Sequence, residues 1–141
     1  MHRATSAWQP TTVLAGDLDH AREVLAAASS VVVLTGAGIS TDSGVPDYRG
    51  PDSIRATPMM FSEFVGDPLA RQRYWARNFQ GWAHLTAARP NAGHQALAFW
   101  ERVGRPTALS GVITQNVDGL HEAAGTQRLI TLHGRSADVI C

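Results

Sequence analysis

Three groups of residues are of types that could bind a nucleotide or move a proton. Gly36 and Gly38 follow an apolar run, and glycine lets a backbone approach a ligand closely because it has no Cβ. Gln115 and Asn116 are uncharged hydrogen-bonding residues that suit ribose hydroxyls and a positioned water. His133 carries an imidazole, which titrates near neutrality and can accept a proton from a hydroxyl. These types favour a nucleotide site with a general base, although a lone histidine is more often a structural residue.

Each of the three groups stands at the end of a predicted strand. Short apolar runs predict strands at 31–35, 109–114 and 128–132. Helical spacing and capping residues predict helices at 17–29, 67–85 and 90–104, and a turn with a short helix within 117–125. Strands that alternate with helices imply a parallel sheet of the α/β class, which binds ligands beyond the carboxyl ends of its strands. We therefore expect the three groups to converge on one crevice, where the turn at 36–38 would lead into a helix and offer N–H groups to a phosphate.

Two other stretches between the strands carry structural expectations. Residues 42–58 are rich in Gly, Pro, Ser and Asp, which predicts a long loop of a functional type, often a lid. The helix at 67–85 has an apolar face formed by Leu69, Trp75, Phe79 and Trp82. We interpret this face as core packing, the usual role of aromatic stripes. In the helix at 90–104 the inward residues are predicted to be Ala96, Leu97 and Trp100.

The composition bounds the class of protein. The chain of 141 residues is 44% hydrophobic and 17% charged, which fits a single globular domain, predicted at 17–141 after an N-terminal tail at 1–16. Twelve basic and twelve acidic residues balance, which argues against a nucleic-acid partner. The lone cysteine, Cys141, cannot form an internal disulfide and favours a cytoplasmic location. No apolar run approaches the roughly 20 residues that span a membrane.

Five short motifs raise the specificity of the nucleotide prediction. They occur in order as GAGIS at 36–40, GVPDYRG at 44–50, PNAGHQAL at 90–97, TQNVDGLH at 114–121 and LHG at 132–134. The glycine pair alone is weak, because the dehydrogenase fingerprint would place a third glycine where this chain has Thr41. The five motifs together closely resemble the sirtuins, which are NAD-dependent protein deacylases, over about residues 20–141. The stretch at 71–82 resembles their class II branch.

The resemblance implies a fold and a reaction. The chain would be the N-terminal portion of a sirtuin, a partial Rossmann-like parallel sheet with flanking helices that is truncated at the start of the zinc-binding module. It would consume NAD as a co-substrate, remove an acyl group from a protein lysine, and release nicotinamide and O-acyl-ADP-ribose. Two alternatives stay open: a protein ADP-ribosyltransferase of the class II type, and a non-catalytic NAD-binding relic.

The resemblance also assigns roles to residues. His133 would activate a ribose hydroxyl, with Asn116 as the second catalytic residue. The NAD-binding residues would be Gly36, Ala37, Gly38, Ile39, Asp47, Tyr48, Arg49, Gln115, Asn116, Val117, Asp118 and His133. The carboxylate of Asp118 suits the nicotinamide amide, although Asn-Val-Asp-Gly by itself favours a turn. His94 and His121 match family motifs too, and we expect packing or hydrogen-bonding roles for them.

Cys141 matches the first ligand of the sirtuin zinc module. A structural zinc site typically has four ligands, arranged as two Cys pairs, and this chain carries one such cysteine. A sheet that lacks its remaining strands would leave an open edge and exposed apolar surface. The sequence therefore predicts a chain that is poorly stable and inactive on its own.

Overall fold

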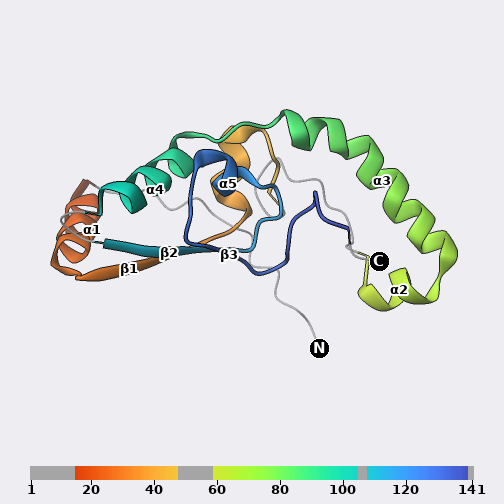
Figure 1. Ribbon diagram of the computed structural model, residues 1–141, viewed down its shortest axis with the longest axis horizontal. Coiled ribbons are helices and arrows are strands. Elements are labelled where there is room, and N and C mark those ends of the chain that lie inside the picture. Colours follow the sequence, from red (N-terminus) through yellow and green to blue (C-terminus); the bar gives the residue numbers. More distant parts are fainter. Residues whose placement is uncertain (1–14, 48–58, 105–107, 140–141) are drawn as a thin grey trace.

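The structure is a computed structural model that describes residues 15–47, 59–104 and 108–139. In these residues three strands form a parallel sheet in the order β1 (Ser30–Thr35), β2 (Ala108–Thr114) and β3 (Leu129–Thr131). The helices are α1 (Ala15–Ala27), the 3-10 helix η1 (Ala37–Ser43), α2 (Phe61–Gly66), α3 (Pro68–Ala87), α4 (Ala92–Val103) and α5 (Leu120–Ala124). The α/β fold with a parallel sheet is confirmed, and Figure 1 shows the sheet with α4 and α5 beside it.

The carboxyl ends of the three strands lie level with one another. Thr35 of β1 pairs with Thr114 of β2, and Thr114 pairs with Thr131 of β3. The ladder continues one residue further on both sides, because Gln115 donates from its backbone to Thr35 and Leu132 donates to Thr114. The segments that follow the strands therefore start from one edge of the sheet, as the alternation of helices and strands predicts.

The core lies between β2 and the helices α4 and α5. Leu109 and Val112 of β2 are each 1% exposed, and Ala98 of α4 and Leu120 of α5 are buried with them. Apolar side chains on the outer strands and directly after β3 remain more than half exposed, namely Val32, Leu34, Ile130 and Leu132. The expected exposed apolar surface is therefore present on this sheet.

Helices α2 and α3 form an arm that extends away from the sheet (Figure 1). The arm is held together locally: the ring of Phe64 meets that of Tyr74 edge to face at 5.0 Å, and Arg71 donates to the carbonyls of Phe64 and Val65. Asp67 caps α3 by accepting from the backbone of Leu69, as predicted from the Asp-Pro pair. We call α2 and α3 together the arm.

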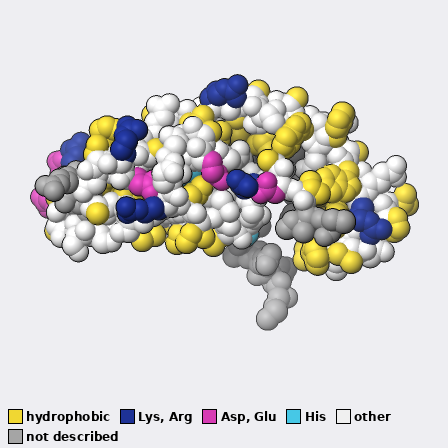
Figure 2. Space-filling view, in the orientation of Figure 1, with side chains coloured by type: hydrophobic (Ala, Val, Ile, Leu, Met, Phe, Trp, Pro, Cys, Tyr) yellow, Lys and Arg dark blue, Asp and Glu magenta, His cyan; other side chains and the backbone are white. Residues whose placement is uncertain are grey.

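The prediction that the aromatic face of α3 packs in a core is wrong. Its four members are at least 43% exposed, and Phe79 reaches 83%. The reason is that α3 extends away from the sheet: the ring of Phe64 in α2 meets that of Trp75 at 6.5 Å, but this contact leaves most of the face exposed among the described residues. Figure 2 shows hydrophobic side chains gathered over the arm. The face consists of Leu69, Trp75, Phe79 and Trp82.

Other differences from the sequence-based expectations are smaller. Ala96 is exposed, because α4 buries the face that carries His94 and Ala98, while Leu97 and Trp100 are half-buried as expected. The predicted loop at 42–58 begins inside η1, and its residues 48–58 lie outside the described residues. No helix in the described part of the chain is long and apolar enough to cross a bilayer.

Candidate functional site

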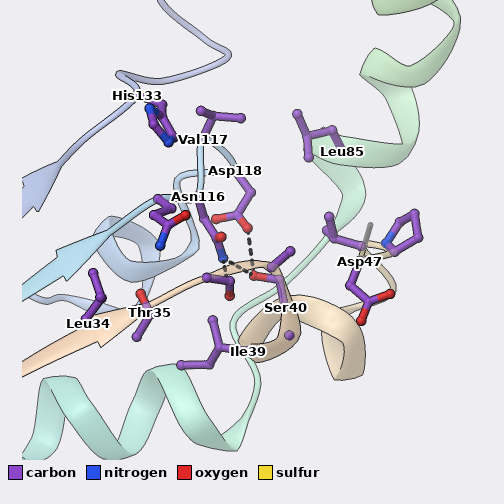
Figure 3. Close-up of a pocket in the computed structure, with 16 residues that line it drawn as sticks. Leu34, Thr35, Ile39, Ser40, Asp47, Leu85, Asn116, Val117, Asp118 and His133 are labelled. Atoms are coloured by element: carbon purple, nitrogen blue, oxygen red, sulfur yellow. Dashed lines mark hydrogen bonds between the residues drawn. The ribbon is translucent and has the colours of Figure 1, made fainter. Parts of the chain in front are cut away.

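A hollow of about 900 Å³ opens at the carboxyl edge of the sheet. Its walls come from η1 and the residues after it, from the loop after β2, from the segment after β3, and from Leu85 of α3. Figure 3 places His133 on one side of the hollow and Leu85 and Asp47 on the other. The predicted site residues that line it are Gly36, Ala37, Gly38, Ile39, Asp47, Gln115, Asn116, Val117, Asp118 and His133. Ten predicted residues from three separate segments thus meet in one crevice.

The glycines at the start of η1 keep the floor of the hollow open. A Cβ added to Gly36 or Gly38 would meet nothing within 4 Å, so these residues border empty space. Gly36 is extended, with φ −140°, so any residue could adopt its backbone conformation. The reason for glycine here is therefore access to the backbone and not a left-handed turn. The predicted helix after this turn is a 3-10 helix.

Ser40 joins the two sides of the crevice and was missed by sequence reasoning. Its hydroxyl is fully buried, donates to Asp118 Oδ2 at 2.7 Å, and accepts from Asn116 Nδ2 at 3.0 Å. Asn116 Nδ2 also donates to the carbonyl of Gly36 at 3.1 Å (Figure 3). The signal in the sequence was its place as the last residue of the GAGIS motif. These bonds fix the loop after β2 against η1.

Asp118 lies both in a turn and in the crevice, the two roles predicted for it from the sequence. Its Oδ1 accepts from the backbone of Leu120 at 2.9 Å, and Gly119 between them has φ +75°, which is a turn at the start of α5. Its Oδ2 accepts from Ser40. An ionised carboxylate has about four lone-pair sites, so both oxygens retain capacity for a ligand donor. The turn and the placement in the crevice therefore coexist.

The segment after β3 carries His133 to the crevice. Ser136 donates from its backbone and from its hydroxyl to the carbonyl of Val117, at 2.9 and 2.5 Å. This pair of bonds ties the segment to the loop after β2. The side chain of His133 is exposed and lines the hollow, which leaves the imidazole accessible to a ligand.

Helix α4 and the arm support η1 from outside the crevice. Asn91 caps α4 and also donates through Nδ2 to the carbonyl of Ile39 at 2.7 Å and to Ser43. A Cβ on Gly93 would come within 3.3 Å of Ile39, so α4 begins in close contact with η1. On the other side, His84 Nε2 lies 2.8 Å from the carbonyl of Gly44.

Three predicted site residues fall outside the described residues: Tyr48, Arg49 and Cys141. Their predicted roles stay predictions. The described residues contain no cluster of three or more His, Cys, Asp or Glu side chains that could hold a metal ion. The packing and hydrogen-bonding roles expected for His94 and His121 are confirmed, since both rings are buried and hydrogen-bonded.

The sequence pattern of the Sir2 family matches residues 36–141, which is most of the chain and includes the ten predicted site residues that line the crevice. The chain belongs to the Sir2 family. It is 57% identical to NAD-dependent protein deacetylase 1 of Mycobacterium avium over 115 residues, covering 82% of this chain and 40% of that protein. It is 49% identical to NAD-dependent protein deacetylase 1 of Streptomyces coelicolor, covering 99% of this chain and 47% of that protein.

Solved Sir2 structures share the fold. One described as a Sir2–p53 peptide–NAD+ complex superposes with a TM-score of 0.69 at 36% identity, covering 84% of this chain and 46% of that one. The chain therefore spans less than half the length of these curated relatives and of this Sir2 structure. The parallel sheet with its flanking helices corresponds to part of the Sir2 fold.

Proposed function

We propose that this Sir2-family chain binds NAD in the crevice and supplies His133 as the base for removal of an acyl group from a protein lysine. The observation that carries the proposal is the convergence of ten predicted residues on one hollow at the strand ends. The relatives with which it shares about half its residues are NAD-dependent protein deacetylases. A solved relative with the same fold is described as a complex with a p53 peptide and NAD+.

The residues present fit a dinucleotide. The open space beside Gly36 and Gly38 admits a pyrophosphate close to the backbone, because neither residue has a Cβ to block it. The hollow of about 900 Å³ lies within the range of roughly 300–1,000 Å³ that is usual for small-molecule sites. When bound, NAD supplies the ADP-ribosyl group that receives the acyl group and releases nicotinamide.

The side chains of the crevice have two different roles, ligand orientation and proton transfer. Ser40, Asn116 and Asp118 form a fixed set of hydrogen-bonding groups, so their orientation costs little when a ligand binds. His133 is exposed at the rim, where an imidazole nitrogen can accept a proton from a ribose hydroxyl. The acyl-lysine protein is the proposed second substrate.

The prediction of a structural zinc ion rests on Cys141 alone. The described residues offer no metal cluster, and Cys141 lies outside them. No step of the proposed reaction depends on a metal. The class II assignment likewise stays a prediction from residues 71–82.

The test uses the 141-residue chain and its His133→Ala variant, with His20→Ala as a control on the exposed helix α1. Calorimetry measures NAD binding, and chromatography measures nicotinamide and deacetylated peptide formed from an acetyl-lysine peptide. We expect both variants to bind NAD, and any turnover to fall at least about a hundredfold in His133→Ala alone. Failure of the folded chain to bind NAD, or turnover unchanged by His133→Ala, would contradict the proposal, and NAD binding without any turnover in the unmutated chain would replace it by the non-catalytic relic. Transfer of labelled ADP-ribose to protein without deacetylation would replace it by the transferase alternative.

A further inference from the structure

Two buried histidines lie behind the crevice and do not line it. The side chain of His94 in α4 is fully buried, and that of His121 in α5 is 1% exposed. Their rings meet edge to face with centroids 4.8 Å apart. His121 Nε2 lies 2.9 Å from the hydroxyl of Thr35, and His94 Nδ1 accepts from the backbone of Asn91 at 3.4 Å. We call His94 and His121 the histidine pair.

The hydrogen bonds fix the tautomer of each ring. Thr35 donates its single hydroxyl proton to Thr114 Oγ1 at 2.9 Å, so it must accept from His121, whose proton is therefore on Nε2. Because His94 Nδ1 accepts from Asn91, its own proton is on Nε2. His94 Nε2 and His121 Nδ1 have no hydrogen-bond partner among the described residues. A second proton on His121 would therefore create a buried N–H without an acceptor.

The bonds of His121 lead directly to the crevice. Thr114 Oγ1, which accepts from Thr35, also accepts from the backbone N–H of Asn116 at 3.1 Å. Thr35 and Thr114 are both buried at the ends of their strands. The direction of the Thr35 hydroxyl therefore determines which lone pair of Thr114 remains for the Asn116 amide.

We propose that His121 is a positioning residue, which as its neutral Nε2–H tautomer holds Thr35 and Thr114 and, through them, the backbone of Asn116. The ring of His94 supports this arrangement by packing against His121. The positioning of Asn116 by His121 does not depend on the proposed function. Any effect of this positioning on the affinity for NAD does rest on the proposed function.

Acid should weaken this arrangement. Burial lowers the pKa of both histidines; the neighbouring His94 ring lowers that of His121 further, and Asp118 partly opposes the shift at both rings. Glu122 also opposes it at His121, whereas β1 bonds the ring through the neutral hydroxyl of Thr35, and neither β1 nor β2 carries a charged residue. In the unfolded chain a histidine has a pKa of about 6.5 and binds a proton more readily than the folded pair does. The contribution of the histidine pair to the free energy of unfolding is therefore fully present above about pH 6.5 and is lost progressively as the pH falls below that value.

Nitrogen-15 NMR of the imidazoles tests the tautomer directly. Long-range proton–nitrogen spectra of the 141-residue chain, recorded from pH 8 to pH 5, distinguish Nε2–H, Nδ1–H and doubly protonated rings. We expect His94 and His121 to show the Nε2–H form and to stay neutral at pH values where free histidine is charged. An Nδ1–H form of His121, or titration of both rings like free histidine, would overturn the proposal.

Amide hydrogen exchange at Asn116 tests the positioning. His121→Gln keeps an N–H near the position of Nε2 and cannot titrate, whereas His121→Leu has a similar size and no N–H. We expect exchange at Asn116 to rise about tenfold in His121→Leu and to stay within about threefold of the parent in His121→Gln, with a shallower loss of stability in acid. His20→Gln on α1 is the matched control and should change neither. Equal effects of the Gln and Leu variants would overturn the proposal.

A second variant covers the case in which His121→Leu does not fold. Thr35→Val keeps the shape of the side chain and removes the hydroxyl that links His121 to Thr114. We expect faster exchange at Asn116 with little change in the exchange of amides in α4. Unchanged exchange at Asn116 would contradict the inference. Because these measurements need no ligand, they remain decisive even if the chain binds no NAD, which would instead contradict the proposed function.

Discussion

The sheet region, which includes α4 and α5, differs from the arm in how its side chains are buried. In the sheet region buried groups are both apolar, as in Leu109, and polar, as in Ser40 and His94. In the arm most of the large apolar side chains remain exposed, and the contacts are local ones such as the Phe64–Tyr74 pair. Because buried apolar area is the main source of stability, the sheet region should carry most of the free energy of unfolding.

The difference also separates two kinds of contribution to the crevice. The sheet region supplies its polar groups, held by hydrogen bonds between segments far apart in the sequence. The arm supplies one wall residue, Leu85, and the bond from His84 to the carbonyl of Gly44. We therefore expect changes in the sheet region to affect folding and binding together, and changes in the arm to affect neither strongly.

The largest contrast should come from two truncations of apolar side chains. Leu109→Ala in β2 removes a side chain that is 1% exposed, and should lower the free energy of unfolding by about 2–5 kcal/mol. Phe79→Ala in α3 removes a larger side chain that is 83% exposed, and should change it by less than about 0.5 kcal/mol. Urea unfolding followed by circular dichroism measures both. A cost for Phe79→Ala equal to that for Leu109→Ala would show that the arm packs into a core.

An intermediate effect is expected for Ser40→Ala. The change leaves Asp118 Oδ2 and one proton of Asn116 Nδ2 without their buried partner, which should cost about 1–3 kcal/mol of stability. The matched control is Thr41→Ala, because Thr41 is exposed and bonds only locally to the carbonyl of Gly38. Thermal unfolding separates the two variants. Equal midpoints would mean that the Ser40 bonds do not stabilise the fold.

The smallest contrast should come from the two helix caps. Asn91→Ala removes the cap of α4 together with the bonds to Ile39 and Ser43, and should cost about 2 kcal/mol, the upper end for a cap. Asp67→Ala removes the exposed cap of α3 and should cost about 0.5–1 kcal/mol. The same unfolding assay ranks them. A reversed order would break the distinction between the two regions.

Much of the fold could be predicted because its signals are local. The apolar runs identified all three strands to within about one residue at most ends, and the Asp-Pro and Pro-Asn pairs identified the starts of α3 and α4. The convergence of the crevice followed from the topology of parallel sheets and needed no knowledge of side-chain contacts.

The parts that were not predicted depend on contacts between distant segments. Whether the aromatic face of α3 is buried depends on what lies opposite it, which spacing along one helix cannot show. Ser40 was missed because a serine hydroxyl has no signal of its own until Asp118 and Asn116, about 80 residues away, are placed beside it. Helix α2 is a single short element of 61–66 with no strong periodicity.

Titration of NAD into the nitrogen-15-labelled chain, followed by amide NMR spectra, is the most direct test of NAD binding in the crevice. We expect saturable shifts at Gly36, Gly38, Asn116 and His133, and none at Phe79 in the arm. The same titration of the Ser40→Ala variant should show weaker binding at the same amides. Shifts confined to other parts of the molecule, or no shifts in a folded chain at millimolar NAD, would contradict it.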